Sequence, residues 1–394
     1  MGSAAAVAHR VESAFRHDIP SLDGLRALSI AIVVLSHTSS LLPAAVARSG
    51  LFRYLIGGGL HGVQVFFVIS GYLITTLLLR EFDRSRNISL GHFYTRRTLR
   101  IFPPFYLYLA VVALLWATGA RQDRSTFLAA ATYTIVYLPH PRGWLLQHAW
   151  SLSIEEQFYL LWPTVLRHAV RRGAALQTVL AALAIIPIIR IILLILSNPR
   201  SADHNRLLVN SSAVDMLTVG CLLALLSPDV RWRKWCRRWI TPWSVLGAGS
   251  LGLVLVPYAN VKLSATFLAV PAGALGYTAT ALAIGAVLEY LVRAPQSIVG
   301  RMLNAGPVRH IGAISYSIYL WQQLFTENPA RLGFLTYPLI LIAAEVSFWL
   351  IERPLMRVRA RYDSGGRYRA DTAELTSSAT SASVAAASPN ASIQ

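Results

Sequence analysis

The sequence is poor in charge: only 14% of its 394 residues are Asp, Glu, Lys or Arg, whereas 55% are hydrophobic. A typical soluble domain carries about 25% charged residues. The low charge therefore excludes a soluble fold of this length and places the chain among membrane proteins. Acidic residues are the scarcest, with 18 Asp and Glu against 36 Lys and Arg, which gives a formal net charge of +18.

Cysteine is nearly absent, with Cys221 in an apolar stretch and Cys236 in a basic one. Two isolated cysteines indicate neither a disulfide framework nor a zinc cluster, and no metal site is predicted. Residues 1–20 lack the apolar core of a cleavable signal peptide. We expect them to form a cytoplasmic N-terminal segment, with the first span directing insertion.

Long apolar runs, in contrast, are abundant. A membrane-spanning helix needs about 20 mostly apolar residues, so the sequence predicts an all-α integral membrane protein with about ten transmembrane helices. The predicted spans are 27–46, 60–79, 102–118, 150–166, 174–197, 208–226, 241–257, 263–291, 310–327 and 333–352. The shorter run 125–139 suits an interfacial or re-entrant segment.

The distribution of Lys and Arg predicts the orientation. With ten spans and both termini cytoplasmic, most basic residues fall in inner segments such as 80–100 and 231–238, as the positive-inside rule requires. An eleventh span at 125–139 would turn 231–238 outward. Topology and the lipid bilayer thus explain the positive charge, and no nucleic-acid partner is expected. Residues 358–394 are rich in small and polar residues and predict a disordered cytoplasmic tail, which leaves 21–357 as the transmembrane domain.

Ionisable residues inside spans are costly and mark candidate functional sites. Arg26 and His37 stand three helical turns apart, so they share one face about 16 Å from each other. This spacing places Arg26 at the cytoplasmic rim and His37 deep in the membrane. Histidine can take a proton from a hydroxyl near neutral pH. The alternative is structural: Arg26 anchors the helix end and His37 bonds a neighbouring helix.

Three arginines, Arg96, Arg97 and Arg100, cluster just inside the predicted cytoplasmic boundary. Guanidinium groups bind phosphate bidentately and keep their charge when partly desolvated, so this block could hold a phosphorylated donor. The alternative is a stop signal that faces phospholipid. The sequence therefore predicts either a phosphate site or a lipid contact here.

Two adjacent glutamates begin the fourth predicted span. Ser153 and Glu156 fit a capping box, which would make Glu156 part of the helix end. Glu155 falls on one helical stripe with Ser151, Tyr159 and Trp162, a wall that could orient a histidine or bind sugar hydroxyls. Alternatively, Glu155 is solvated at the interface.

Further polar residues interrupt apolar runs. Gln64 either lines a polar cavity together with the residues named above, or it forms a hydrogen bond with another helix. Asp215 is an intramembrane carboxylate that needs a partner, for which Arg190 and Arg206 are candidates.

These motifs together resemble the acyltransferase-3 family of membrane-bound O-acyltransferases. The motifs that carry the resemblance are Arg26 with His37, Gly62-Val-Gln-Val-Phe-Phe, Arg96-Arg-x-x-Arg-Ile-x-Pro, Trp150-Ser-Leu-Ser-Ile-Glu-Glu-Gln-Phe-Tyr, Ile314-Ser-Tyr-Ser-Ile-Tyr-Leu-Trp and Ile351-Glu-Arg-Pro. They occur in family order over nearly the whole membrane domain.

The resemblance implies transfer of an acyl group, commonly acetyl, from cytoplasmic acyl coenzyme A to a hydroxyl of a carbohydrate or glycan. His37 and Glu155 then become candidate catalytic residues. The candidate binding residues are Arg26, Arg96, Arg97, Arg100, Gln64 and Tyr159. His37 would act as a general base or be acylated as a relay. No permanently bound cofactor is expected. The resemblance further implies a multi-pass protein of the cell membrane, which in a bacterium is the inner membrane.

Two features differ from the family pattern. Many members have a histidine after Tyr-Leu-Trp, where this chain has Gln322 and Gln323. Some members carry a C-terminal hydrolase-like domain, and here only the tail follows the last span. A proton-coupled transporter of acidic or acylated solutes is the main alternative function, because intramembrane Arg, His and Glu also build proton pathways. A membrane scaffold held together by polar contacts is a third.

Overall fold

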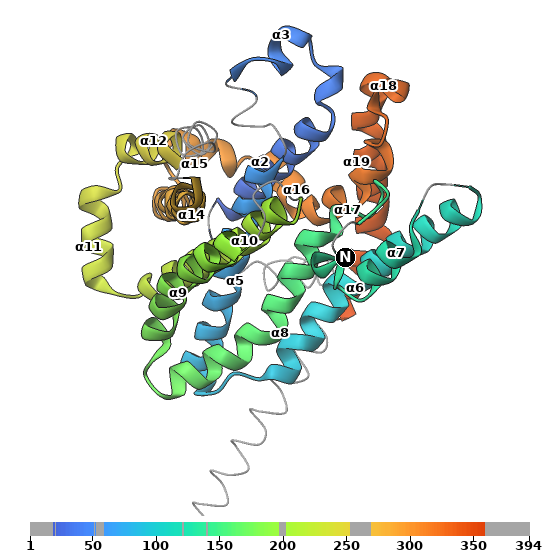
Figure 1. Ribbon diagram of the computed structural model, residues 1–394. Coiled ribbons are helices and arrows are strands. Elements are labelled where there is room, and N and C mark those ends of the chain that lie inside the picture. Colours follow the sequence, from blue (N-terminus) through green and yellow to red (C-terminus); the bar gives the residue numbers. More distant parts are fainter. Residues whose placement is uncertain are drawn as a thin grey trace, which may run out of the picture.

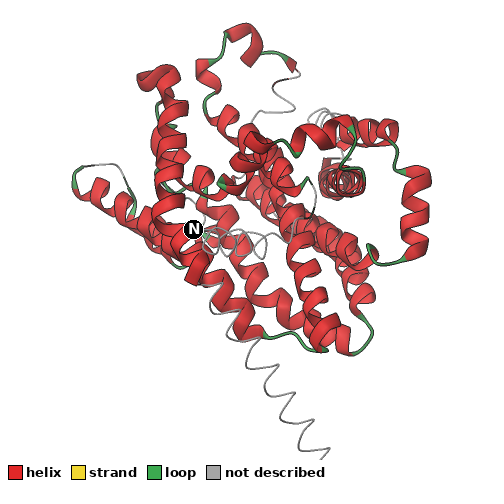
Figure 2. Ribbon diagram, turned by 180° about the vertical axis from the view of Figure 1, so that it is seen from behind, coloured by secondary structure: helices red, strands yellow, loops and turns green. Residues whose placement is uncertain are grey.

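The computed structural model describes residues 19, 21–50, 52, 59–119, 122–138, 141–196, 202–252 and 269–358. Over these residues the regular structure is helical, without a strand (Figure 2). The longer helices are α2 Leu22–His37, α5 Leu60–Ser85, α6 Leu90–Ala117, α7 Arg124–Ala131, α8 Ala149–Arg171, α9 Ala175–Leu196, α10 Ala202–Leu226, α11 Val230–Trp239, α12 Pro242–Ser250, α14 Ala269–Arg293, α16 Gly306–Ala313, α17 Ser315–Phe325 and α19 Thr336–Ser347. The shorter ones are α3 Ala44–Ala47, α15 Ile298–Leu303 and α18 Pro329–Leu332. The predicted all-α class is confirmed.

Six helical stretches among the described residues are long and apolar enough to cross a membrane. They are Leu60–Ser85, Leu90–Ala117, Ala175–Leu196, Val209–Leu226, Ala274–Arg293 and Pro329–Val358. Each corresponds to one predicted span. The ranges 27–46, 150–166, 241–257 and 310–327 have no counterpart among the six, so the total of ten and the side on which the termini lie remain predictions.

Two of the predicted spans are not continuous helices. The range 27–46 was expected to be one helix, but α2 ends at His37 and is followed by a 3₁₀ turn and α3. The range 310–327 is divided at Ile314, between α16 and α17. A count of apolar residues over about 20 positions does not resolve such breaks, although Thr38, Ser39, Ser40 and Pro43 stand at the first one. The first break places His37 at a helix end.

The apolar run 125–139 does not form a span. It folds into α7, which has 8 residues, and a 3₁₀ turn at Ile135–Tyr137. Eight helical residues extend about 12 Å, well short of the hydrocarbon core. This agrees with the prediction that the run is an interfacial or re-entrant segment.

The centre of the fold is the packing of α5 against α10, with α2 on the other side of α5 (Figure 1). Glycines permit the close approach: a Cβ on Gly71 would collide with the backbone of Leu217, and one on Gly220 would collide with the backbone of Val68. Small residues at helix crossings are typical of membrane bundles, where close backbone contact supplies the attraction. The α2–α5–α10 core therefore positions the remaining helices.

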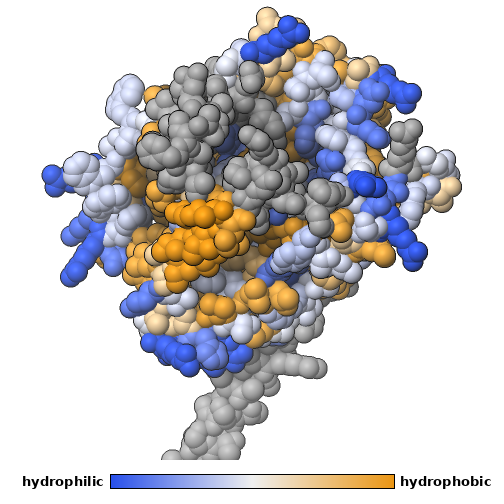
Figure 3. Space-filling model, in the orientation of Figure 1, coloured by the Kyte–Doolittle hydropathy of each residue, from blue (hydrophilic) through white to orange (hydrophobic). Residues whose placement is uncertain are grey.

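Large apolar side chains are exposed on the outer helices. On α9, exposed isoleucines include Ile188, Ile189, Ile192 and Ile195. Figure 3 shows an extended orange area on this face, with blue side chains below it. An apolar surface of this kind is unfavourable in water and suits contact with lipid. The chain is a multi-pass membrane protein.

The proposed terminal segments cannot be compared with the structure. Residues 1–20, apart from Ile19, and residues 358–394, apart from Val358, lie outside the described residues.

Candidate active site

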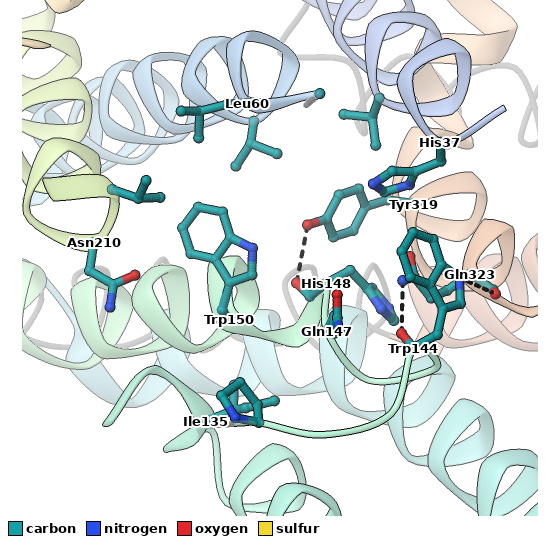
Figure 4. A pocket seen from close by; sticks show the side chains of 15 residues that line it. His37, Leu60, Ile135, Trp144, Gln147, His148, Trp150, Asn210, Tyr319 and Gln323 are labelled. Carbon is teal, nitrogen blue, oxygen red and sulfur yellow. Dashed lines mark hydrogen bonds between the residues drawn. The ribbon is translucent and has the colours of Figure 1, made fainter. Parts of the chain in front are cut away.

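A cavity of about 490 Å³ opens beside the C-terminal end of α2. Its wall combines aromatic and polar side chains, labelled in Figure 4: His37, Trp144, Gln147, His148, Trp150, Asn210, Tyr319 and Gln323. These residues come from α2, the segment before α8, α8 itself, α10 and α17. The cavity therefore lies where distant parts of the chain converge.

His37, the expected catalytic residue, is the last residue of α2 and lines this cavity. Its Nδ1 lies 2.9 Å from Oε1 of Gln322 on α17. The imidazole also meets the indole of Trp144 edge to face, with 5.3 Å between ring centroids. The ring is thus held on two sides by residues far away in the sequence.

His148 is a second histidine on the cavity, and sequence analysis missed it. Its side chain is only 4% exposed, and neither ring nitrogen has a hydrogen-bond partner among the described residues. Tyr108 and Tyr319 contact the ring edge to face. A buried imidazole without a partner is unfavourable and points to a ligand or water that completes its hydrogen bonds. Its position just before the Trp-Ser-Leu motif was the available signal.

Glu155 and its expected stripe on α8 face the interior. Ser151 lies 2.6 Å from the hydroxyl of Tyr319 on α17. One turn further on, Glu155 accepts a short hydrogen bond from Ser70 on α5. The hydroxyl of Tyr159 lies 3.3 Å from the same carboxylate oxygen. Trp162 completes the stripe and donates to Thr75 of α5 at 2.8 Å.

The start of α8 differs from the prediction. The helix begins at Ala149 rather than at Ser153, whose hydroxyl donates instead to the carbonyl of Ala149 at 2.9 Å. The prediction of a capping box at Ser153 and Glu156 is therefore wrong. Ser-x-x-Glu spacing also occurs within a helix, where a hydroxyl can bond the carbonyl four residues earlier. Glu156 belongs to the body of α8, beside Glu155.

The predicted basic residues lie away from the cavity: Arg26 is near the start of α2, and the three arginines of the block are on α6. Arg26 pairs with Asp23 at 3.2 Å, and Arg96 pairs with Glu81 at 3.1 Å. Arg97 lies over the ring of Tyr159. Both Arg97 and Arg26 are close enough to Glu155 to interact electrostatically with it.

Arg100 stands near the buried Glu352, which accepts a short hydrogen bond from Ser317 of α17. The structure thus brings Arg26, Arg97, Glu155 and Tyr159 together, while Arg96 and Arg100 face other carboxylates.

Gln64 is buried, but it is not part of the cavity wall. Its Oε1 lies 2.8 Å from Nδ1 of His61 on the same helix, and its Nε2 has no partner among the described residues. Its neighbour Val63 does line the cavity. A role of Gln64 in substrate binding remains a prediction.

Asp215 has the partner that the sequence suggested. Its Oδ2 accepts from Arg190 at 2.6 Å and from Thr278 at 2.9 Å, and the two charged side chains are 0% and 1% exposed. Arg190 further donates to the Ser211 hydroxyl and to the Ala274 carbonyl. This ion pair connects α9, α10 and α14 next to Asn210, which lines the cavity.

Taken together, the fold and the site define a membrane protein with a basic end, a polar stripe on α8 that includes Glu155, and a histidine-bearing cavity. A family model described as an acyltransferase domain matches residues 19–351. The chain belongs to this family, the acyltransferase-3 family, whose enzymes transfer acyl groups other than aminoacyl groups.

Curated relatives agree with the family assignment. The chain is 27% identical over 365 residues to the O-acetyltransferase OatA of Staphylococcus aureus strain NCTC 8325, with 86% of this chain and 57% of the relative covered. It is 28% identical over 376 residues to the peptidoglycan O-acetyltransferase OatA of Listeria monocytogenes, with 87% and 56% covered. The chain thus spans little more than half the length of these relatives. No solved structure matches it significantly.

Proposed function

We propose that the protein is a membrane O-acetyltransferase that moves an acetyl group from acyl coenzyme A to a hydroxyl of a glycan, with peptidoglycan as the acceptor class. One observation carries the proposal, the polar stripe of α8. At one end its Tyr159 packs against Arg97 of α6, in the middle lies Glu155, and at the other end Ser151 meets Tyr319 of α17 beside the cavity. A donor bound at one end and an acceptor bound at the other would meet along this stripe. The names of the curated relatives support the acetyl group and the acceptor class.

The basic end is suited to the donor. Coenzyme A carries phosphates, which guanidinium groups bind in a bidentate manner. Arg97 makes no ion pair among the described residues, and its guanidinium is held by an aromatic ring instead. Its N–H groups are therefore better placed for a phosphate than those of Arg96, which pairs with Glu81. The flexible arm of the donor would extend along the stripe toward His37.

The cavity is suited to the acceptor. Trp144, Trp150 and Tyr319 offer flat faces on which the apolar side of a sugar ring can pack. The two ring nitrogens of His148 have no hydrogen-bond partner among the described residues. Sugar hydroxyls can donate to or accept from an imidazole. The acceptor would thus complete the hydrogen bonds of His148 while one of its hydroxyls faces His37.

The chemistry follows from this arrangement. His37 removes the hydroxyl proton as the oxygen attacks the thioester carbonyl, and a C–O bond replaces the C–S bond. The departing thiolate of coenzyme A then takes the proton from the imidazolium. In the relay route, a nitrogen of the imidazole attacks the acyl carbon, and the thiolate of coenzyme A leaves and takes the proton that the ring gives up. The acceptor oxygen then attacks the acyl-imidazole, the C–N bond breaks, and the hydroxyl proton passes to the imidazole.

Thiol release tests the function directly. Purified protein in nanodiscs is given acetyl coenzyme A and soluble peptidoglycan fragments, and both free thiol and acetylated glycan are measured. We expect acceptor-dependent thiol release from the wild type and its loss in His37→Ala. His310→Ala serves as the matched control, because His310 is an exposed histidine paired with Glu345 away from the cavity.

A transporter would give a different result. Failure of the wild type to release thiol or to acetylate any of these glycans, together with uptake of an acidic or acylated solute into proteoliposomes, would replace the enzyme with the transporter.

A further inference from the structure

The two glutamines that follow Tyr-Leu-Trp hold His37 through a directional chain of hydrogen bonds. We propose that Gln322 and Gln323 are positioning residues that keep His37 in the tautomer with hydrogen on Nδ1, so that Nε2 is free to accept the proton of the acceptor hydroxyl. The inference rests on the proposed function of His37 and adds the groups that set its protonation.

The chain begins at a fixed acceptor. The backbone carbonyl of Trp144 can only accept hydrogen bonds, and it lies 2.8 Å from Nε2 of Gln323 (Figure 4). The amide of Gln323 must therefore direct its nitrogen toward Trp144 and its oxygen the other way. The indole of Trp144 in turn donates to the backbone carbonyl of Gln323 at 3.2 Å, so two hydrogen bonds hold Gln323 against Trp144.

The direction passes from Gln323 to His37. Oε1 of Gln323 can only accept, so the atom of Gln322 at 2.8 Å from it must be the nitrogen. Oε1 of Gln322 then faces the histidine, 2.9 Å from Nδ1. An amide oxygen carries no hydrogen, and a hydrogen bond at this distance requires hydrogen on Nδ1. The neutral imidazole consequently has its lone pair on Nε2.

Burial makes this order hard to reverse. Gln322 is 0% exposed and Gln323 is 1% exposed, so water does not replace a lost partner. If the Gln323 amide rotated, like groups would face each other at Trp144 and at Gln322. If the Gln322 amide rotated, its oxygen would face the oxygen of Gln323. The direction set at Trp144 therefore persists to His37.

The chain also connects the base to the segment that lines the acceptor cavity. Trp144 contacts the His37 ring directly at 5.3 Å between centroids and anchors the glutamine chain at the same time. The histidine, the two glutamines and the tryptophan form a closed circuit of contacts from three parts of the chain. Any movement of the segment that carries Trp144 would therefore change the hydrogen bond at Nδ1 of His37.

The tautomer can be observed without measuring activity. Protein labelled with ¹⁵N-histidine is compared with labelled His37→Ala, and the difference spectrum isolates His37 from the other histidines. We expect a protonated Nδ1 and an unprotonated Nε2 in the neutral ring. A neutral ring with hydrogen on Nε2 would overturn the proposal whatever the enzyme activity.

Kinetics test what the tautomer does. Gln322→Leu removes the acceptor and should lower kcat by about 10–100-fold, with little change in KM for acetyl coenzyme A. A loss of this size is observed when the outer hydrogen-bond partner of a metal-bound histidine is removed. Gln322→Glu has nearly the same volume and keeps an oxygen that accepts from Nδ1, while it loses the donor to Gln323. It should therefore retain more of kcat than Gln322→Leu, but less than the wild type. Size-exclusion profiles of both variants establish that they fold.

The two proposals fail in different ways. Wild-type kcat in folded Gln322→Leu would remove the glutamines from the mechanism while leaving His37 in place. Wild-type transfer in His37→Ala would instead remove His37 as the base, and absence of transfer by the wild type would refute the proposed function.

Discussion

The guanidinium carbon of Arg97 lies 4.1 Å from the centre of the Tyr159 ring, and the hydroxyl of that tyrosine reaches Ser70 and Glu155 at 3.1 and 3.3 Å. One aromatic side chain thus joins the cation of α6 to the carboxylate of α8. The stacking orients the guanidinium while leaving its edge available for hydrogen bonds. This relationship distinguishes Arg97 from the other two arginines of its block.

Replacing Arg97 should therefore weaken donor binding most. Hydrogen bonds to charged groups contribute about 1.5–3 kcal/mol, so we expect Arg97→Ala to raise KM for acetyl coenzyme A roughly 10–100-fold. Arg97→Lys should recover only part of this, because an ammonium group cannot bind bidentately. Steady-state kinetics measure the effect. Arg171→Ala is the control, since Arg171 is an exposed arginine that bonds Asn87; an equal effect of both variants would contradict a specific phosphate site.

Loss of the Glu155 carboxyl group should reduce the rate rather than donor affinity. Glu155 accepts hydrogen bonds from Ser70 and Tyr159, so its carboxylate is fixed on the stripe between donor and acceptor. We expect Glu155→Gln to lower kcat by about 100-fold, the size of one acid–base contribution. Glu156→Gln changes the neighbouring carboxyl group in the same way and is the matched control. Unchanged kcat in Glu155→Gln would reduce Glu155 to a structural role.

The Arg190–Asp215 ion pair should be important for stability. Both side chains are buried, so removing either one leaves an uncompensated charge, at a cost of about 3–5 kcal/mol. We expect Arg190→Leu and Asp215→Leu each to lower Tm clearly, and the double variant to recover part of the loss. Thermal unfolding in detergent measures this. Arg96→Ala breaks a partly exposed pair with Glu81 and should cost less, about 0–1 kcal/mol. Equal losses at the two pairs would argue against a special role of the buried Arg190–Asp215 pair.

The predicted orientation can be tested with single cysteines. Arg48→Cys lies at the end of the first helical region, and Arg84→Cys lies near the end of α5 on the side of Arg96. With both termini cytoplasmic, a membrane-impermeant maleimide should label Arg48→Cys in intact cells and Arg84→Cys only after permeabilisation. The native Cys221 and Cys236 are buried and should give little background. The reverse labelling pattern would show that the orientation is opposite to the predicted one.

Some of the site follows from local sequence. The helical stripe of Ser151, Glu155, Tyr159 and Trp162 was predicted from spacing, and the structure shows these side chains meeting α5 and α17. Side chains three or four positions apart share a helix face in any helix, so this needs no tertiary information. The membrane class, the helical class and the family motifs are likewise properties of composition and order along the chain.

Other features depend on which distant residues meet. The partner of His37 is 285 residues away, and nothing in the sequence connects it to α2. The sequence marked Gln322 only as a difference from the family, and it did not mark His148 at all. The breaks after His37 and at Ile314 were also missed, because the spans were placed from apolar content averaged over about 20 residues. Periodicity along one helix is written in the sequence itself. Contacts between helices, and the bends that permit them, arise only when the close packing of α2, α5, α8, α10 and α17 decides which side chains share a cavity.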